Sequence, residues 1–182
     1  MSKENADKEQ KRSFKREAFS WIACIVVTIL LTEFILNFVI INANIPSGSM
    51  ENTIMTNDKL IALRTSYWFN DPKRGDIIIF KYPDDETEWF IKRVIALPGE
   101  TVLVKDGKVY INGSKKALSE PYIKEEPVED FGPYKVPKNG YFVMGDNRNN
   151  SNDARDWETH YVSRDEILGK AWFRYYPSIK VI

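Results

Sequence analysis

The longest apolar run in the chain, residues 18–41, constrains its fold more than any other feature. It reads AFSWIACIVVTILLTEFILNFVII. About 20 apolar residues cross a bilayer core as a helix. A cleavable leader segment has a shorter apolar stretch, of about 7–15 residues, and a core helix is rarely apolar on all sides over this length. Residues 18–41 are therefore predicted to form one retained transmembrane anchor.

Basic residues flank this run on one side only. Six Lys and Arg residues lie within residues 1–17, and the next basic residue after the run is Lys59. Basic flanks stay in the cytoplasm. Residues 1–17 are thus predicted to be a cytoplasmic basic tail, disordered or loosely helical. Residues 42–182 are predicted to be extracytoplasmic, in a single-pass protein of the cell membrane.

Glu33 is the one acidic residue inside the anchor. A carboxylate at mid-bilayer costs about 2.5–3.5 kcal/mol. Either it lies in the outer half and protonates or reaches the interface, or it joins Asn37, four residues on, in contacting a partner helix. The first interpretation is favoured.

The rest of the chain predicts β structure. β-branched and aromatic runs alternate with turn signals, at residues 76–82, 88–97, 101–105, 108–112, 141–145 and 167–176. Asp106-Gly107 joins two of them and is typical of a type I′ hairpin. Residues 114–139, rich in proline and charge, are predicted to be a long surface loop. The predicted fold class is mainly β: a single antiparallel, sheet-rich domain behind one transmembrane helix.

Composition excludes several classes of function. Lys plus Arg and Asp plus Glu both number 26, so no global charge argues for a nucleic-acid partner. The single cysteine, Cys24, excludes an intramolecular disulfide and a cysteine-based metal cage. The single histidine, His160, is the only imidazole base a hydrolase here could use.

A serine-containing turn follows the anchor within about eight residues, in the segment IPSGSMENTI, residues 45–54. Pro46 fixes φ and Gly48 permits unusual dihedrals, so the turn could hold Ser47 or Ser49 forward. Most such turns are plain surface loops. The place of this one, at the bilayer surface, is what makes it informative.

A serine hydroxyl needs a base to become a nucleophile. His160 lies in a polar stretch and is predicted to be a solvated surface residue. Lys92 is the other option, because burial among apolar groups lowers a lysine pKa. Alternation along EWFIKRVIAL places Lys92 on one face with Phe90, Val94 and Ala96. The alternative, an outward lysine that protects a sheet edge, is equally compatible with this pattern.

The segment YFVMGDNRNNSNDAR, residues 141–155, takes an apolar strand into a dense polar turn. Such a turn is either bonded to itself or part of a polar site. Asp153 and Arg155 suggest an internal ion pair. A calcium site is an alternative, but the spacing lacks the acidic positions of a calcium loop. We therefore expect no metal and no cofactor.

Together these segments resemble the type I signal peptidases, membrane-bound serine proteases with a Ser/Lys dyad. The resemblance covers roughly residues 40–176, and it is closer to the single-span Gram-positive form. Its motifs, in family order, are PSGSM (46–50), RGDIIIF (74–80), IKRVIALPGE (91–100) and GDNRNNSNDAR (145–155).

The resemblance implies specific roles. Ser49 would be the nucleophile and Lys92 the general base, with an acyl-enzyme intermediate. Ser47 would contribute to the oxyanion hole, and Ser151 would orient the lysine. Arg93, Asp146, Asp153 and Arg155 would be structural. Ile45, Pro46, Phe90 and Ile91 are candidates to line shallow pockets for the small residues at −1 and −3 of the substrate.

Two departures and two rival functions accompany this resemblance. Ala154 stands where the family commonly has serine, and Glu51-Asn52 replaces a commoner proline-containing sequence.

The implied partners are precursor proteins bearing signal peptides, the lipid bilayer and the secretion machinery. The rivals are a self-cleaving repressor-type protease, which the anchor disfavours, and a non-catalytic membrane-anchored β-domain that binds exported chains.

Overall fold

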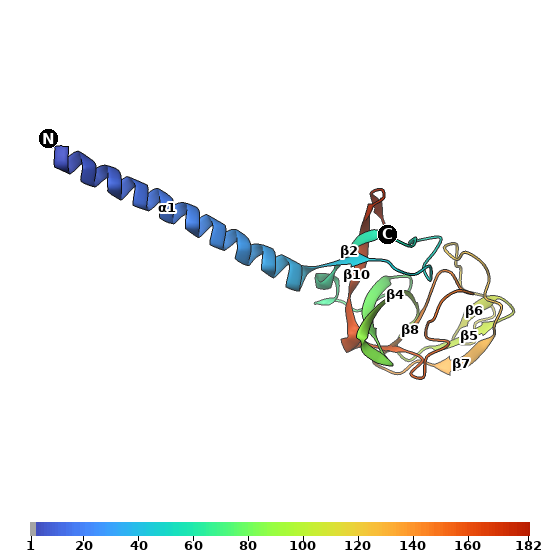
Figure 1. Cartoon of the computed structure of the whole chain (residues 1–182). Coiled ribbons are helices and arrows are strands. Elements are labelled where there is room, and N and C mark those ends of the chain that lie inside the picture. Colours follow the sequence, from blue (N-terminus) through green and yellow to red (C-terminus); the bar gives the residue numbers. More distant parts are fainter. Residues whose placement is uncertain (1–2) are drawn as a thin grey trace. The chain divides into compact units, whose positions relative to one another are not determined.

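The computed structural model describes the backbone of residues 3–182 and the side chains from Phe14 onward. The chain divides into two compact units, residues 1–39 and residues 40–182. The first unit is helix α1 (Lys3–Phe34), continued by one π-helical segment, Ile35–Val39 (Figure 1). Residues Phe14–Val39 are long and apolar enough to cross a membrane, with a mean hydropathy of 2.4.

The limits of this helix differ from those predicted at both ends. Helix α1 begins at Lys3, so residues 3–17 have a helical backbone; the predicted basic side chains of Lys3, Lys8, Lys11 and Arg12 lie outside the described residues. At the other end, Ile40 and Ile41 belong to strand β1 rather than to the anchor. Ile41 is buried in the core of the second unit. Hydropathy cannot separate a bilayer from a protein core, because both remove apolar groups from water.

Near the end of the span, Asn37 contacts the predicted intramembrane carboxylate. Its side-chain amide donates to the Glu33 carboxylate at 3.1 Å and to the Glu33 carbonyl oxygen at 2.8 Å. These two polar residues thus satisfy one another within a single helix.

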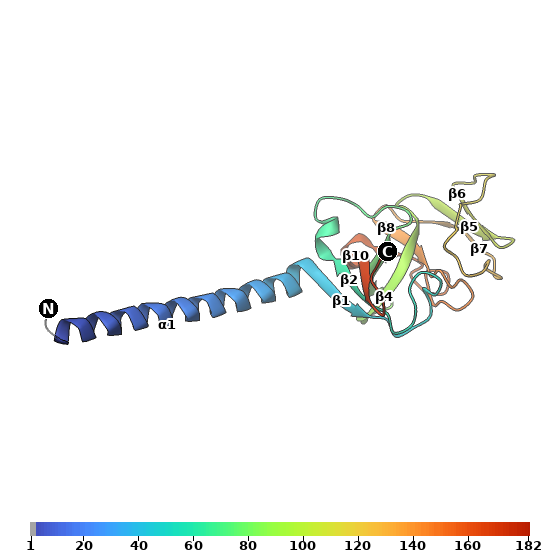
Figure 2. The ribbon, with the colours of Figure 1, turned by 90° about the horizontal axis from the view of Figure 1, so that it is seen from above.

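The second unit is built from antiparallel strands, as predicted, in two sheets. The larger has eight strands in the order β1-β2-β10-β3-β4-β8-β9, with β11 paired to β10, and the smaller has the order β6-β5-β7 (Figures 1 and 2). The larger sheet contains β1 (Ile40–Asn44), β2 (Lys59–Leu63), β3 (Ile77–Tyr82), β4 (Asp85–Ala96), β8 (Gly140–Met144), β9 (Val162–Ser163), β10 (Ile167–Tyr176) and β11 (Lys180–Val181). The smaller contains β5 (Thr101–Lys105), β6 (Lys108–Ile111) and β7 (Phe131–Lys135). Short 3-10 turns cover Arg64–Tyr67 and Arg164–Glu166.

The smaller sheet includes a strand that the sequence did not predict. Strand β7 lies inside the segment 114–139, which was expected to be loop only, and pairs with β5. Gly132 and Pro133 interrupt its pattern, so only its pairing identifies it as a strand. The predicted hairpin is present: Asp106 and Gly107 both have positive φ, 50° and 74°, as a type I′ turn requires.

Strand β3 explains why its sequence is an unbroken apolar run. Ile78 and Phe80 pack into one core cluster, whereas Ile77 and Ile79 pack into a second cluster on the opposite face. A strand covered on both faces has no solvent side and needs no polar residues. This central strand is therefore packed on both faces, and it pairs with β4, the strand that carries Lys92.

Strand β4 departs from simple alternation near its end. Its pairing with β8 shifts register between Val94 and Ala96, which is a bulge. As a result Val94, Ile95 and Ala96 all pack into the same cluster. The predicted alternation of faces therefore ends at Val94, beyond Lys92.

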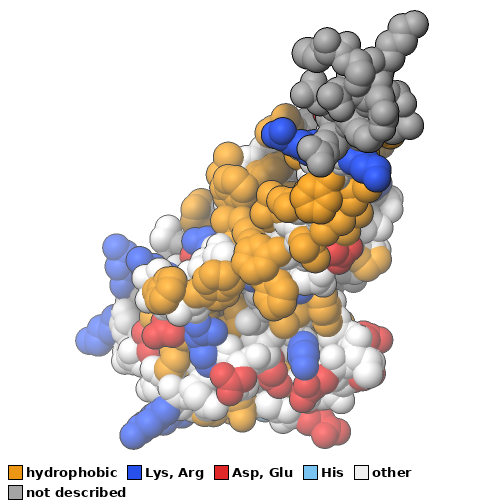
Figure 3. All heavy atoms as spheres, turned by 90° about the vertical axis from the view of Figure 1, so that its left-hand side faces the viewer, with side chains coloured by type: hydrophobic (Ala, Val, Ile, Leu, Met, Phe, Trp, Pro, Cys, Tyr) orange, Lys and Arg blue, Asp and Glu red, His pale blue; other side chains and the backbone are white. Residues whose placement is uncertain are grey.

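Apolar side chains remain exposed on the face seen in Figure 3. The exposed large residues of the second unit include Trp68, Phe69, Trp89, Trp172 and Tyr176. Phe69 has 90% of its surface accessible. Trp and Tyr are the side chains most enriched where proteins meet a membrane–water interface.

Candidate active site

The Ser49 turn is held from beneath by the polar segment that follows β8. The backbone N–H of Asn147 donates to the Ser49 carbonyl oxygen at 3.0 Å. The Asn147 side-chain amide donates to the Gly48 carbonyl oxygen, also at 3.0 Å. Ser49 is 6% exposed, so its turn is fixed against the domain rather than free in solvent. No sequence signal beyond turn chemistry pointed to Asn147.

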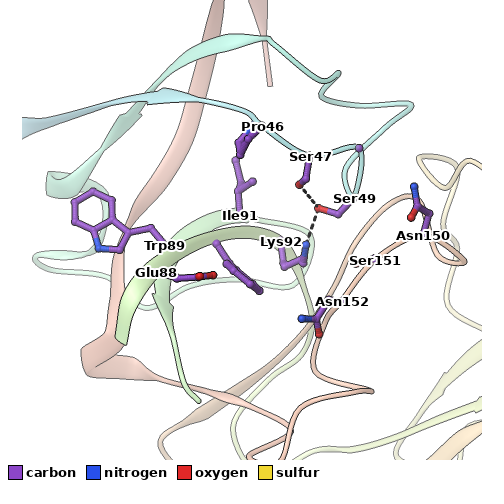
Figure 4. Close-up of a pocket in the computed structure, with 12 residues that line it drawn as sticks. Pro46, Ser47, Ser49, Glu88, Trp89, Ile91, Lys92, Asn150, Ser151 and Asn152 are labelled. Carbon is purple, nitrogen blue, oxygen red and sulfur yellow. Dashed lines mark hydrogen bonds between the residues drawn. The ribbon is translucent and has the colours of Figure 1, made fainter. Parts of the chain in front are cut away.

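Lys92 meets the Ser49 hydroxyl directly. It lies on β4, only 4% exposed, and its Nζ is 2.6 Å from Ser49 Oγ. Figure 4 shows both side chains pointing toward one another, with Ser47 Oγ on the other side of the serine at 3.4 Å from Ser49 Oγ. Two segments 43 residues apart in sequence are thus joined at one hydrogen bond.

Burial changes the acidity of this lysine. It lowers the pKa of Lys92 from 10.5 to about 8, while the nearby Asp153 carboxylate opposes the shift. The Phe90 ring, with its centroid 5.4 Å from Nζ, contributes to the apolar surroundings. A lysine of this kind is neutral often enough near physiological pH to accept a proton.

Ser151 borders the same cavity as Lys92 but makes its hydrogen bond elsewhere. Its hydroxyl donates to the Asp153 carboxylate at 2.8 Å. Among the described residues, no hydrogen bond joins Ser151 to Lys92. Gly145 packs tightly beneath both serines, since a Cβ at this position would lie well inside 3.0 Å of Ser151 Oγ and of the Ser49 carbonyl oxygen.

Two buried ion pairs hold the walls of the site. Arg93 contacts Asp146 through two hydrogen bonds, of 2.8 and 2.6 Å. Arg155 contacts Asp153 in the same bidentate way, at 2.8 and 3.0 Å. All four side chains are at most 10% exposed, and paired geometry of this kind offsets the cost of burying the charges.

Ser49 and Lys92 line a cavity of about 410 Å³. Its wall includes Pro46, Phe90 and Ile91, which the sequence analysis named as pocket residues. Ile45, named with them, is absent from this wall and packs in the core at 3% exposure. The cavity wall also includes residues that the sequence analysis missed, namely Glu88, Trp89, Asn150 and Asn152. No sequence signal distinguished these residues from other strand and turn positions.

His160 lies away from this cavity. It is half-buried rather than solvated, contrary to expectation, because its ring packs edge-on against Phe131 and Tyr134. Its Nδ1 is 2.8 Å from the Ala154 carbonyl oxygen. Ala154 itself is fully buried in the apolar core. Among the side chains described from Phe14 onward, no group of His, Cys, Asp and Glu is arranged to hold a metal ion.

Comparison with known proteins places this chain in a family. The family model described as "Signal peptidase, peptidase S26" matches residues 18–176. The chain is 44% identical over 161 residues to a probable signal peptidase I-2 of Synechocystis, covering 86% of this chain and 72% of that protein. It is 35% identical over 179 residues to signal peptidase I of Bacillus amyloliquefaciens, covering 93% and 94%.

A solved structure is also similar. The crystal structure of a signal peptidase I from Enterococcus faecalis V583 is 35% identical, with a TM-score of 0.48, covering 56% of this chain and 97% of that one. The resemblance seen in the sequence is confirmed: this chain belongs to the signal peptidase family, peptidase S26, and is a peptidase of the hydrolase class.

Proposed function

We propose that this protein is a membrane-anchored serine endopeptidase that removes N-terminal signal peptides through a Ser49/Lys92 dyad and an acyl-enzyme intermediate. The observation that carries the proposal is the 2.6 Å contact between Lys92 Nζ and Ser49 Oγ inside an open cavity. Family membership supports the reaction, which is signal-peptide removal by a serine protease.

The first step is proton transfer. With a pKa of about 8, roughly one Lys92 in ten is neutral at pH 7. The neutral amine accepts the Ser49 proton as the hydroxyl oxygen attacks the scissile carbonyl carbon. The resulting ammonium then donates that proton to the departing amine, and the acyl group remains on Ser49. A water molecule, deprotonated by Lys92, then releases the acyl group.

The negative charge that develops on the scissile carbonyl oxygen needs hydrogen-bond donors to stabilise it. The Ser49 N–H has no acceptor among the described residues, so it is available to an incoming oxyanion. The Ser47 hydroxyl, on the same turn, is the second candidate donor. Loss of one such donor costs about 3–4 kcal/mol in comparable sites. Ser151, on the cavity wall and bonded to Asp153, is proposed to orient the Lys92 ammonium.

The cavity shape supports an extended substrate. Its wall includes Pro46 and Ser47 of the serine turn and Phe90 and Ile91 of strand β4; Figure 4 shows Pro46 and Ile91 near one another beside the Ser49–Lys92 contact. A peptide between two extended segments bonds through its backbone, so alternate side chains point into the walls. The shallow apolar lining suits small residues at −1 and −3.

The membrane setting follows from the anchor. Strand β1 starts at Ile40, directly after the apolar helix, so Ser49 is only ten residues beyond Val39. We propose that residues 1–17 are cytoplasmic, that the domain acts outside the cell membrane, and that precursors arrive with the secretion machinery as partner. The exposed aromatic residues Trp68, Trp89 and Trp172 suit contact with the bilayer surface.

The decisive test uses the full-length chain in detergent micelles and a precursor with small residues at −1 and −3. Ser49→Ala and Lys92→Ala are each expected to abolish cleavage, with a native circular dichroism spectrum and a cooperative unfolding transition as the control for folding. A rate that rises with pH and levels above about pH 8 is expected from the Lys92 pKa. Full activity in Lys92→Ala, or a flat profile from pH 6 to 9, would overturn the dyad.

A further inference from the structure

A second cleft adjoins the catalytic cavity. It has a volume of about 400 Å³, close to that of the first. Ser151 lines both, so the segment around this residue is the shared border. The remaining wall of the second cleft is polar, formed chiefly by Glu129, Arg148, Asn149, Arg155 and Asp156. Nothing in the proposed chemistry uses this second cleft.

The expected direction of the bound substrate brings the residues after the scissile bond toward this cleft. The proposed function puts residues −1 and −3 of the substrate along Pro46, Phe90 and Ile91. The N-terminal side of the scissile bond therefore occupies the part of the cavity that these residues line, together with Trp89. In Figure 4, Asn150 lies on the opposite side of Ser49 from Trp89, and the next residue, Ser151, borders both cavities. Residues after the scissile bond therefore leave past Ser151.

Both arginines of this cleft form ion pairs, so a carboxylate balances the charge of each. Arg148 is 2.6 Å from Glu120, and Arg155 is 2.8 Å from Asp153. All four side chains are less than 10% exposed. These pairs build the floor of the cleft and contribute no net charge to it.

Two further carboxylates remain, Glu129 and Asp156. Both are exposed, and both act on the pKa of Arg155 through space, which locates them around the same guanidinium group. With the two arginine pairs balanced, they leave the cleft with a net negative charge. A peptide crossing it meets this charge within a few residues, since an extended chain advances about 3.3 Å per residue.

We propose that this cleft binds the first residues of the mature chain, after the scissile bond, and that Glu129 and Asp156 make it prefer basic or neutral side chains over acidic ones. The inference rests on the proposed endopeptidase function. The charge preference extends substrate specificity beyond the small residues at −1 and −3. The charge of the residues just after the scissile bond would then help to determine which precursors are cleaved quickly.

The test compares peptides that differ in one residue. Full-length protein in micelles is given peptides with small residues at −1 and −3 and with Lys, Gln or Glu placed in turn at +1 to +4. At low salt we expect kcat/KM for Lys to exceed that for Glu by about 3- to 10-fold at one or more of these positions. The ratio should fall toward one at high salt, because the carboxylates are exposed.

Substitutions in the cleft test whether its carboxylates cause the preference for Lys over Glu. Glu129→Gln should reduce the Lys/Glu ratio, and Glu129→Lys should bring it to one or invert it. Asp156→Asn should act in the same direction, since an amide oxygen can still accept the Asp153 N–H. Glu86→Gln is the matched control: it removes one exposed charge on β4, outside both clefts, and should leave the ratio unchanged.

The results distinguish a failure of the cleft assignment from a failure of the proposed function. If the Gln peptide is cleaved by the wild type but not by Ser49→Ala, and no charge preference exists at any position, the cleft assignment is wrong while the proposed function stands. A preference that persists unchanged in Glu129→Lys also overturns the assignment. If the Gln peptide is not cleaved at all, the proposed function fails, and this inference fails with it.

Discussion

Asn147 and Ser49 are joined backbone to backbone, by the 3.0 Å hydrogen bond from the Asn147 N–H to the Ser49 carbonyl oxygen. The Asn147 side chain also holds the preceding carbonyl oxygen, that of Gly48. The C=O and N–H of one trans peptide point in opposite directions. Anchoring the Gly48 oxygen inward therefore turns the Ser49 N–H outward, where an oxyanion would form.

Asn147→Ala should consequently reduce kcat by about 10- to 100-fold, with KM changed little, because the lost bond orients a transition-state donor. A peptide boronate that mimics the tetrahedral state should lose affinity to a similar extent, whereas an uncleavable peptide should not. Asn139→Ala, at an exposed amide before β8, is the control. Equal losses for boronate and peptide would contradict this role.

Gly145→Ala tests the close packing beneath the two serines. The added methyl would overlap Ser151 Oγ and the Ser49 carbonyl oxygen, and the latter is backbone that cannot rotate away. Because φ at Gly145 is not positive, steric overlap is the only expected cost. We expect cleavage to fall by at least about 100-fold while the sheet still forms, as measured by turnover and circular dichroism. Near-normal turnover would show that the turn relaxes.

Lys92→Met separates activity from stability. The folded-state pKa of Lys92, about 8, lies below the ordinary 10.5, so below pH 8 the fold holds a charged group that burial disfavours. The variant should be inactive yet more stable at pH 7, by up to about 2–3 kcal/mol.

The stability gain of Lys92→Met should depend on pH, and the lowered pKa of Lys92 determines in which direction. Between pH 8 and 10.5 the unfolded wild type binds a proton that the folded form does not, so wild-type stability rises with pH. The advantage of Lys92→Met should therefore shrink across this window, in urea unfolding curves taken at several pH values. An advantage that grows with pH would contradict the assigned shift.

Asp146→Asn should destabilise the domain strongly. The change leaves Arg93 buried without its charged partner, a loss of about 3–5 kcal/mol in comparable cases. Glu86→Gln breaks the exposed Lys81–Glu86 pair at 3.1 Å and should cost at most about 1 kcal/mol. Similar unfolding midpoints for the two variants would mean that burial does not strengthen the Arg93 pair.

His160→Ala should leave kcat/KM and the pH profile unchanged, because the ring packs against Phe131 and Tyr134 outside the cavity that Ser49 and Lys92 line. Loss of that packing, and of a ring nitrogen near the Ala154 carbonyl, should lower the melting temperature by a few degrees, equivalent to about 1 kcal/mol. A large fall in kcat at unchanged stability would return His160 to the list of candidate bases.

Much of this architecture could be predicted from local patterns. The apolar run, the strand segments and the Asp106-Gly107 hairpin depend on neighbours in sequence, and all appear in the structure. Strand β7 could not be predicted, because Gly132 and Pro133 disfavour a strand unless β5 supplies a partner. Ile45 packs in the core and not in the cavity wall for a similar reason: an apolar residue beside the Ser49 turn can face the core as readily as the cavity.

The sequence by itself determined an apolar anchor, a β-rich domain behind it, and Ser49 and Lys92 in motifs of a known order. Only the tertiary structure brought Lys92 Nζ to Ser49 Oγ, opened a cavity beside them, and placed Asn147 under the serine turn. The physical reason is burial. On strand alternation alone, Lys92 was as compatible with a solvated edge as with a core. Its lowered pKa arises from desolvation by segments distant in sequence, and only the fold brings them together.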